Sequence, residues 1–354
     1  MKKYNVAIVG IRGVVGQSML ETLKQRSFPY NKLKLISTSC EKDFTDENGN
    51  LIEKIREDIF EDVQIGLFSP GASVSKIWAP IAAKSGCVVI DNTSQFRMDA
   101  DVPLVVPEVN PLDIAKHHGI IANPNCSTIQ MVVALKPLHD FARIKRIVVS
   151  TYQAVSGAGG DAITELESQM MVDALRLMKK YKIDAGVVSK LESELGSELK
   201  VSKFPHQILA NLIPQIDVTM PNLYTKEEMK MVNETKKIMG DDNIKVTATC
   251  VRCPVFYGHS ESVNIETENK ISREKAVELL SAAPGVTVLD DLSNNVYPTP
   301  VFADGKDDTF VGRIREDETI KNGLNLWIVA DNIRKGAALN AIQIAEEMIR
   351  QGLI

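Results

Sequence analysis

The stretch VAIVGIRGVVG at residues 6–16 decides the fold of the first part of the chain. Its first part, Val6–Val9, is a continuous apolar run, as expected of a parallel strand that is covered on both faces. Three glycines spaced G-x-x-G-x-x-G follow between Gly10 and Gly16, and an apolar stripe at helical spacing begins at Met19. A strand, a glycine turn and a helix in this order predict the start of a parallel α/β domain that binds a dinucleotide.

The glycine turn is the first candidate binding site. Backbone N–H groups at a helix N-terminus can bind a phosphate group, and glycine lets the ligand approach because no Cβ stands in the way. The spacing departs from the usual G-x-G-x-x-G, so a tight strand-to-helix turn without a ligand is the alternative interpretation. The residues expected to contact a cofactor here are Gly10, Ile11, Arg12, Gly13, Val14, Val15 and Gly16.

The end of the second strand indicates which dinucleotide is preferred. In NAD-binding proteins an acidic residue at this place binds the ribose 2′-hydroxyl, but residues 37–39 here are Ser-Thr-Ser. The hydroxyls of Ser37 and Thr38 would bind a 2′-phosphate, and Arg12 or Lys42 would neutralise its charge. The sequence therefore predicts NADP as the cofactor.

Strand-like and helical patterns alternate until about residue 126, which predicts a parallel sheet with right-handed crossovers. The charged stretch 43–62 is interpreted as a surface excursion. The later pattern is mixed α+β, and its runs 245–250 and 262–267 alternate in the manner of antiparallel strands. The other expected segments are strands at 33–36, 65–68, 88–90 and 147–152 and helices at 74–83, 129–138, 162–181, 227–239 and 337–349.

The composition excludes several classes of protein. A length of 354 residues predicts two domains, and a formal net charge of -5 argues against nucleic acid and anionic membranes as partners. Five cysteines, an odd number, do not make a disulfide framework and indicate reduced thiols in the cytoplasm. No apolar run approaches the roughly 20 residues of a membrane-spanning helix, and no signal-peptide core follows Met1. We therefore expect a cytoplasmic enzyme.

Cys126 is the candidate nucleophile. It lies in NPNCST at residues 123–128, just before a helix expected to begin near Ile129, where the helix dipole favours a thiolate. Ser127 and Thr128 are candidate helix caps. The alternative is that the side chain is a small buried apolar group, as most free cysteines are.

A thiolate nucleophile needs a base, and the chain has five histidines. His259 is the best-placed candidate because it lies between two strand-like segments, although the sequence alone does not bring it to the nucleophile. The pair Cys250 and Cys253 forms a C-x-x-C with no second pair, so we interpret both as strand cysteines and expect no metal site.

Taken together, the motifs resemble those of the bacterial aspartate-semialdehyde dehydrogenase family, from residue 10 to about residue 340. The resemblance implies NADP-dependent, phosphorylating oxidation of an amino-acid semialdehyde in lysine, threonine and methionine biosynthesis. No single motif is specific, but the combination is. Besides the glycine turn and NPNCST, the motifs are SQFR at 94–97, VVPEVN at 105–110, YQAVSGAG at 152–159, PQID at 214–217, GHSE at 258–261 and DN at 331–332 with GAA at 336–338.

The resemblance also assigns roles in catalysis and substrate binding. Cys126 resembles the nucleophile that becomes an acyl thioester, and His259 resembles its acid/base partner. Gln153 resembles the residue that orients the acyl intermediate. Arg252 resembles the residue that binds the substrate carboxylate, and Glu227 the one that contacts its amino group. The neighbouring Glu228 is the alternative, and Glu227 is preferred because it keeps three residues to the next lysine.

Phosphate and cofactor contacts complete the implied site. Arg97 and Lys230 resemble the pair that binds inorganic phosphate. Ser156, Gly157 and Asn332 resemble contacts on the nicotinamide side of the cofactor. The implied chemistry is addition of a thiolate to an aldehyde, loss of hydride to the nicotinamide, and attack of phosphate on the resulting thioester.

The resemblance also implies the architecture. We expect a Rossmann-type NADP-binding domain over 1–125 and 330–354, because Asn332 has to reach the cofactor, and a mixed α+β catalytic and dimerisation domain over 126–329. The long helix after Gly160 is expected at a subunit interface, giving a homodimer or homotetramer, and Ser189 to Lys203 is interpreted as an exposed insertion.

Three alternatives stay open at this point. The first is a related reductase on the same plan, such as N-acetyl-glutamyl-phosphate reductase or malonyl-CoA reductase. The second is a non-catalytic dinucleotide-binding regulator, against which the presence of both Cys126 and His259 argues. The third is a structural subunit whose second domain serves mainly to oligomerise.

Overall fold

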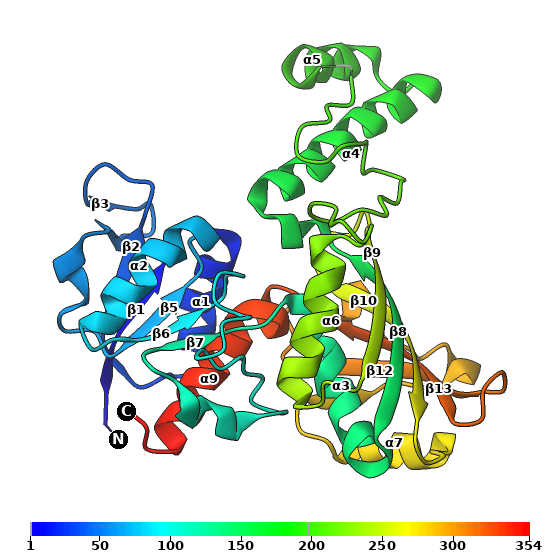
Figure 1. The fold of residues 1–354 in the computed structure, drawn as a ribbon. Coiled ribbons are helices and arrows are strands. Elements are labelled where there is room, and N and C mark those ends of the chain that lie inside the picture. The colour runs from blue at the N-terminus through cyan, green and yellow to red at the C-terminus, as the bar shows by residue number, and fades with distance from the viewer. Residues whose placement is uncertain (1, 197) are drawn as a thin grey trace.

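The computed structural model describes residues 2–196 and 198–354 and contains two sheets (Figure 1). The first sheet has the strand order β3-β4-β2-β1-β5-β6-β7, and all its neighbouring strands are parallel except β3 and β4. This agrees with the parallel α/β domain expected from residues 6–16. The strands are β1 (Tyr4–Val9), β2 (Tyr30–Ser37), β3 (Phe44–Thr45), β4 (Leu51–Lys54), β5 (Ile65–Phe68), β6 (Val88–Asp91) and β7 (Ile120–Ala122).

Helices cover both faces of this sheet, which explains why its strands read as continuous apolar runs. The helices α1 (Val14–Gln25) and α9 (Leu339–Arg350) share one core cluster with β1 and β5, whereas α2 (Ala72–Lys84) packs in a second cluster on the other face. The last helix of the chain thus returns to the first sheet, and the two termini lie near each other (Figure 1). The exact domain boundaries at 125/126 and 329/330 stay a prediction.

The interpretation of the stretch 43–62 as an irregular surface excursion is wrong in part. The stretch contains β3, β4 and a 3-10 turn, Glu57–Phe60, and β4 pairs in parallel with β2. Ile52, Ile59 and Phe60 are buried. These few apolar residues among many charges give no clear periodic pattern, so the sequence alone does not predict the strand.

The second sheet has the strand order β11-β12-β13-β10-β8-β9 and is mixed. The expected antiparallel pairing holds for β10 with β8, but β9 pairs with β8 in parallel, so the expectation for 245–250 is wrong. An alternating pattern reports one buried face and carries no information on strand direction. The strands are β8 (Ile144–Gln153), β9 (Lys245–Arg252), β10 (His259–Thr267), β11 (Val286–Val288), β12 (Thr309–Asp317) and β13 (Gly323–Ala330).

Three helices, α3 (Cys126–Ala142), α6 (Lys226–Met239) and α7 (Arg273–Ala282), cover one face of this sheet in a single core cluster. The helices α4 (Gly160–Lys180) and α5 (Ala185–Leu195) form a hairpin that projects from the rest of the molecule (Figure 1). Much of the stretch expected to be a plain exposed insertion is therefore helical. A short helix, α8 (Pro300–Ala303), precedes β12.

A buried ion pair ties the end of the chain to the first domain. Lys335 lies in a π-helical turn, Arg334–Ala338, that leads into α9. Its ammonium group donates hydrogen bonds to both carboxylate oxygens of Glu108, at 2.8 and 2.7 Å, and to the side chains of Asn340 and Gln343. Because every acceptor is itself buried or partly buried, the pair fixes the position of the turn.

Candidate active site

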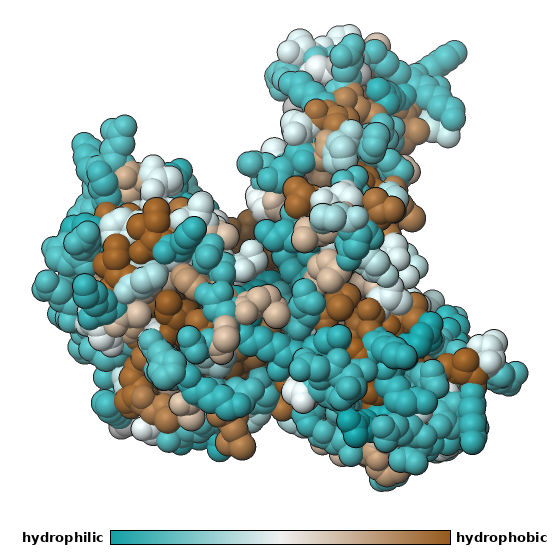
Figure 2. Space-filling view, in the orientation of Figure 1, coloured by the Kyte–Doolittle hydropathy of each residue, from teal (hydrophilic) through white to brown (hydrophobic). Residues whose placement is uncertain are grey.

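The glycine turn, the start of α3, the end of β8 and one face of α6 surround a cleft of about 560 Å³. Figure 2 shows that the surface is hollowed between the first domain and the α4–α5 hairpin. The cleft brings together residues from motifs that lie far apart in the sequence. The predicted site residues that line it are Gly13, Val14, Val15, Arg97, Cys126, Gln153, Ser156, Gly157, Glu227, Lys230, Arg252 and Asn332.

Within the glycine turn, the three glycines serve two purposes. A Cβ on Gly10, whose φ is +92°, would lie 2.7 Å from the carbonyl oxygen of Ser69, and a Cβ on Gly16 would lie 2.4 Å from that of Gly10. These two glycines are required by backbone packing, contrary to the expectation that all three make room for a ligand. Gly13 lines the cleft, and a Cβ there would meet nothing closer than 3.5 Å.

Cys126 is the first residue of α3. The side chain of Asn125 caps this helix by accepting hydrogen bonds from the N–H groups of Ser127 at 3.1 Å and Thr128 at 3.3 Å. The prediction that Ser127 and Thr128 are the caps is therefore wrong, because the helix begins three residues before Ile129. A Cβ on Gly336 would lie 2.7 Å from the Cβ of Cys126, so only glycine fits against this cysteine there.

The electrostatics around the thiol oppose the expected effect of the helix start. Burial raises the pKa of the Cys126 thiol to about 12, and the negative charge of Glu227 acts in the same direction. Arg252, Arg97 and the N–H of Ser127 act against this rise in the pKa. The alternative of a small buried apolar group is wrong as well, since the residue is only partly buried and lines the cleft.

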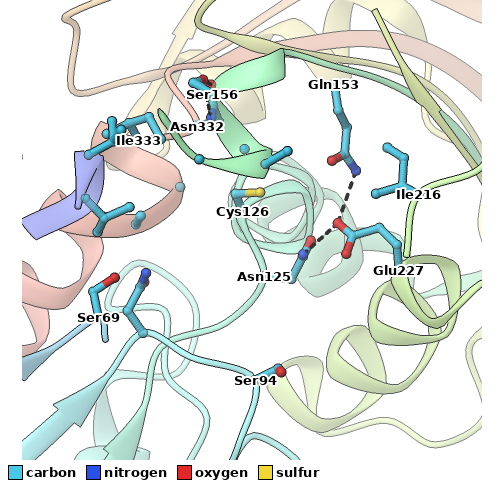
Figure 3. A pocket seen from close by; sticks show the side chains of 18 of the residues that line it. Ser69, Ser94, Asn125, Cys126, Gln153, Ser156, Ile216, Glu227, Asn332 and Ile333 are labelled. Carbon is cyan, nitrogen blue, oxygen red and sulfur yellow. Dashed lines mark hydrogen bonds between the residues drawn. The ribbon is translucent and has the colours of Figure 1, made fainter. Parts of the chain in front are cut away.

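Glu227 lies at the centre of a hydrogen-bond network (Figure 3). Its carboxylate accepts from Lys230 at 2.9 Å, from Asn125 at 2.8 Å and from Gln153 at 3.2 Å. Burial acts to raise the pKa of this carboxyl group, but Lys230 and the hydrogen bonds from Lys230, Asn125 and Gln153 outweigh it and lower the pKa to about 2. The group is therefore a carboxylate over the whole neutral range.

The adjacent Glu228 has a different environment. Its carboxylate accepts the N–H of Thr225 at 2.7 Å in a capping box at the start of α6, and the N–H of Cys250 at 3.1 Å. It does not line the cleft. Of the two neighbouring glutamates, Glu227 is thus the one that faces the candidate site.

His259 lies behind the cleft wall rather than in it. Its ring is fully buried, and its Nδ1 accepts the N–H of Ala154 at 3.0 Å. The neutral ring therefore carries its proton on Nε2, which has no hydrogen-bond partner among residues 2–196 and 198–354. A Cβ on Gly157 would lie 3.1 Å from Nε2, so this glycine separates the ring from the cleft. Burial and then Arg252 lower the pKa of His259 to about 3, against the effect of Glu227.

Two groups beside His259 complete this wall. Arg252 is buried and donates to the carbonyl oxygen of Ala154 at 2.6 Å. Asn332 donates to Ser156 Oγ at 3.0 Å and accepts the N–H of Gly258 at 2.9 Å. Asn332 follows β13 and so links the returning end of the chain to the turn after β8.

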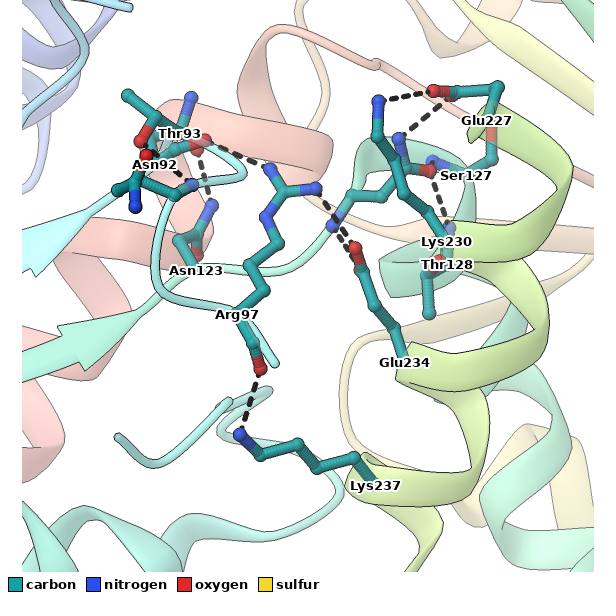
Figure 4. Close-up of polar contacts among 12 residues, drawn as sticks. Asn92, Thr93, Arg97, Asn123, Ser127, Thr128, Glu227, Lys230, Glu234 and Lys237 are labelled. Atoms are coloured by element: carbon teal, nitrogen blue, oxygen red, sulfur yellow. Dashed lines mark hydrogen bonds and ion pairs between the residues drawn. The ribbon is translucent and has the colours of Figure 1, made fainter. Parts of the chain in front are cut away.

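On the other side of the cleft, α6 holds the loop that carries Arg97 (Figure 4). Glu234 accepts a hydrogen bond from Arg97 at 3.1 Å with one carboxylate oxygen and the N–H of Asn125 at 2.7 Å with the other. Lys237 donates to three carbonyl oxygens of that loop, each at 2.8 Å. Lys230, Glu234 and Lys237 thus lie at helical spacing on one face of α6, and Glu234 and Lys237 fix Arg97 and its loop.

Several predicted contacts lie away from this cleft. Gly10, Ile11 and Gly16 do not line the cleft. Ser37 ends β2 and Thr38 follows it, and the side chain of Arg12 reaches this place from the glycine turn. There Arg12 donates to Ser39 Oγ at 3.3 Å, and Ser37 Oγ lies 3.4 Å from the same oxygen. The guanidinium group of Arg12 and the hydroxyl groups of Ser37 and Ser39 therefore lie close together at the place where the sequence predicts binding of the 2′-phosphate of NADP.

Lys203 and Asp217 line the cleft, although the sequence does not predict a role for either. Lys203 is the last residue of the stretch interpreted as an exposed insertion; it is exposed, and it also lines the cleft. Asp217 belongs to the motif PQID and accepts a hydrogen bond from Lys230 at 3.0 Å. The motif PQID could have indicated that Asp217 lines the cleft, whereas nothing in the sequence near Lys203 indicates that Lys203 does.

The remaining cysteines do not contribute to this site. Cys250 and Cys253 are buried, and burial raises the pKa of both thiols. Within the described parts of the chain, no group of three His, Cys, Asp or Glu side chains is arranged to bind a metal ion. In the same residues, no helix combines the length and apolar character needed to cross a membrane.

Comparisons with known proteins agree with this arrangement. Residues 5–117 match the family model "Semialdehyde dehydrogenase, NAD binding domain", and residues 135–335 match "Semialdehyde dehydrogenase, dimerisation domain". The aspartate-semialdehyde dehydrogenase of Aquifex aeolicus is 54% identical, and that of Bacillus subtilis 49%, each with 99% of both chains covered. A crystal structure of Vibrio cholerae aspartate-semialdehyde dehydrogenase II complexed with ASA has a TM-score of 0.88 and 47% identity, with 99% of both chains covered.

The identity and the coverage apply to the whole chain, including both sheets and the α4–α5 hairpin. This chain therefore belongs to the aspartate-semialdehyde dehydrogenase family of NAD(P)-dependent oxidoreductases.

Proposed function

We propose that this chain interconverts L-aspartate 4-semialdehyde, inorganic phosphate and NADP⁺ with L-aspartyl 4-phosphate and NADPH through a thioester on Cys126. The observation that carries the proposal is the position of Cys126 in one cleft with Arg252, Glu227 and the turn residue Gly13. A nucleophile, a cation, an anion and a candidate dinucleotide turn in one cleft suit an aldehyde that also carries a carboxylate and an amino group. The reaction would supply lysine, threonine and methionine biosynthesis.

Substrate recognition follows from the charges. The guanidinium group of Arg252 has no carboxylate within ion-pair distance among the described residues, so it is available for the substrate carboxylate, which it can bind with two hydrogen bonds. Glu227 stays ionised and attracts the substrate ammonium group. Gln153, which hydrogen-bonds to Glu227, would orient the acyl group on Cys126.

The chemical steps assign a task to each remaining side chain. The Cys126 thiolate adds to the aldehyde carbon, and the Nε2–H of His259, which has no hydrogen-bond partner among the described residues, would donate to the oxyanion that forms. Bound NADP⁺ would supply the hydride acceptor. Arg97 and Lys230 would then hold phosphate for attack on the Cys126 thioester, and the thiolate leaves as the acyl phosphate forms.

The acid/base role of His259 requires a change of hydrogen bonding. Taking the thiol proton of Cys126 needs a lone pair on Nε2, whereas the hydrogen bond from Ala154 places the lone pair on Nδ1. We infer that the ring releases Ala154 when it acts as a base. The resting ring is a hydrogen-bond donor.

The residues at the end of β2 fit NADP. Arg12, Ser37 and Ser39 form a cluster of one cation and two hydroxyl groups, and Thr38 lies between the two serines. No carboxylate lies at residues 37–39, where NAD-binding proteins use one for the ribose 2′-hydroxyl. We expect a higher kcat/KM with NADP than with NAD. The exchange Arg12→Ala should reduce this preference, measured as kcat/KM with NADP divided by kcat/KM with NAD. Equal kcat/KM values for the two cofactors in the unchanged protein would contradict the preference.

We propose a homodimer, or a homotetramer built from it, with the projecting hairpin at a subunit interface. Exposed apolar side chains lie along this hairpin, including Met170, Met171, Leu177 and Ile183, and Figure 2 shows brown patches over it. Because Cys126 has to stay reduced, we also propose that the protein works in the cytoplasm. We keep the division into 1–125 with 330–354 and 126–329 as part of this proposal.

The test is phosphate-dependent reduction of NADP⁺ with L-aspartate 4-semialdehyde, followed at the absorbance of NADPH. Cys126→Ala should abolish the reaction while NADPH binding persists. N-acetylglutamate semialdehyde and malonate semialdehyde serve as competing substrates. Preference for either of them would overturn the choice of substrate, and activity in Cys126→Ala would overturn the thioester.

A further inference from the structure

Lys203 lines the cleft from a loop that supplies no other described lining residue between Gly159 and Ile216. It lies after the α4–α5 hairpin and is exposed, yet it lines the cleft together with Ala158, Gly159 and Asp217. No ion pair or side-chain hydrogen bond of its ammonium group occurs with the described residues. A contact of the ammonium group with another side chain of the protein therefore does not explain why Lys203 lies at the cleft.

Two buried side chains of α4 hold the backbone on both sides of Lys203. One carboxylate oxygen of Glu165 accepts the N–H and the O–H of Ser202, each at 2.8 Å, and also the N–H of Lys203. The amide oxygen of Gln169 accepts the N–H groups of residues 208 and 209, at 3.1 and 2.9 Å. A carboxylate that accepts three hydrogen bonds while 5% exposed is a rigid anchor for an otherwise exposed loop.

The order of these anchors shows which way the loop points. Gln169 also donates to the carbonyl oxygen of Lys200 at 2.8 Å, so both ends of the loop lie beside Gln169. Glu165 is one helical turn nearer the start of α4 and holds Lys203 between those ends. The loop therefore extends toward the start of α4, where the backbone at Gly159 lines the cleft.

The charge balance of the cleft leaves this lysine unneutralised. Arg97 is paired with Glu234, and Lys230 is paired with both Glu227 and Asp217. Among the lining cations of the described chain, Arg252 and Lys203 have no carboxylate partner. Arg252 is assigned to the substrate carboxylate, and the other anionic groups of the ligands are phosphates.

We propose that Lys203 binds a phosphate group of a ligand in this cleft, and that Glu165 is the positioning residue that holds Lys203 there. The inference rests on the proposed function, which supplies two sources of phosphate. One is the phosphate that is transferred, and the other is the pyrophosphate of the dinucleotide. Both present the same oxyanion chemistry to the ammonium group.

The experiment compares Lys203→Gln with Lys200→Gln, which removes the same charge three residues away in the same loop. Steady-state KM values are measured for inorganic phosphate and for NADP⁺, and NADPH binding is measured separately by fluorescence titration. Lys203→Gln should raise one of the two KM values about three- to tenfold with little change in kcat, as expected for loss of a partly exposed ion pair. Lys203→Arg should restore it, and Lys200→Gln should resemble the unchanged protein.

The two arms identify the source of the phosphate. A higher KM for NADP⁺ with weaker NADPH binding assigns the pyrophosphate, and a higher KM for phosphate with unchanged NADPH binding assigns the transferred group. Glu165→Ala should reproduce the same selective change while its melting temperature shows that it is folded. Unchanged KM values in Lys203→Gln would overturn the inference and leave the proposed function intact. If the proposed function itself is wrong, the protein without any substitution will be inactive in this assay.

Discussion

The exchange Glu227→Gln tests the hydrogen-bond network beside Cys126, the proposed nucleophile, most directly. The pKa of this carboxyl group is about 2 in the folded chain against an ordinary value of 4.5. A difference of this size corresponds to about 3 kcal/mol of folding free energy at neutral pH. The amide introduced by the exchange would also face the side-chain amides of Asn125 and Gln153, which now donate to the carboxylate of Glu227. We therefore expect the variant to be less stable by about 2–4 kcal/mol.

The sign of the pH dependence follows from the lowered pKa. A carboxylate that is stabilised in the folded state contributes above the pKa of the unfolded chain, and the contribution is lost as the pH falls from about 4.5 toward 2. About 2 kcal/mol of it should be gone near pH 3. Denaturant unfolding of the unchanged protein and of Glu227→Gln, at neutral pH and near pH 3, measures this change in the free energy of unfolding. An equal stability difference between them at the two pH values would refute the reasoning.

Glu228→Gln is the matched control, because Glu228 is the adjacent buried glutamate on the same helix. It caps α6 and binds the N–H of Cys250, so its exchange should lower stability without raising the KM for the aldehyde. Glu227→Gln should raise that KM by about tenfold or more, because it removes a charge from the cleft. A selective KM effect in Glu228→Gln would show that the two glutamates had been assigned in the wrong order.

Three further predictions concern the rest of the cleft. Gly157→Ala places a methyl group 3.1 Å from His259, so kcat should fall about 10- to 100-fold while the melting temperature changes little; an unchanged kcat contradicts this. Glu234→Gln removes the charge that pairs with Arg97 and should raise the KM for phosphate more than that for NADP⁺, as initial rates would show. The raised pKa of Cys126 predicts an iodoacetamide alkylation rate that climbs through about pH 9 in the ligand-free protein, and a plateau near pH 7 would argue against it.

Local patterns predict much of the fold. The strand at 65–68 has the expected limits, and α6 ends at Met239 as expected, because each is a single buried or amphipathic element with clear boundaries. The parallel first sheet follows from the continuous apolar runs. The direction of β9 could not follow in this way, since it is decided by its neighbour β8 rather than by its own sequence.

The candidate site is predictable where motifs carry it. Arg97, Cys126 and Gln153 come from separate motifs, and the fold brings them to one cleft. Lys203 is held by Glu165, 38 residues earlier in the chain, and such a contact leaves no local pattern. The pKa of the thiol also depends on burial between distant segments, so the helix start alone gives the wrong direction.

The contact between Gly336 and Cys126 has a consequence for the time at which the enzyme becomes active. Cys126 is made in the first half of synthesis, but one wall of its surroundings comes from the π-helical turn that Lys335 fixes near the end of the chain. Domains generally fold in the order in which they leave the ribosome, and here the first domain also lacks α9 until synthesis is complete. A nascent chain thus carries its cysteine without a finished site. Premature termination before the last turn and helix would leave a protein that keeps Cys126, Arg252 and His259 but lacks the wall that encloses the thiol.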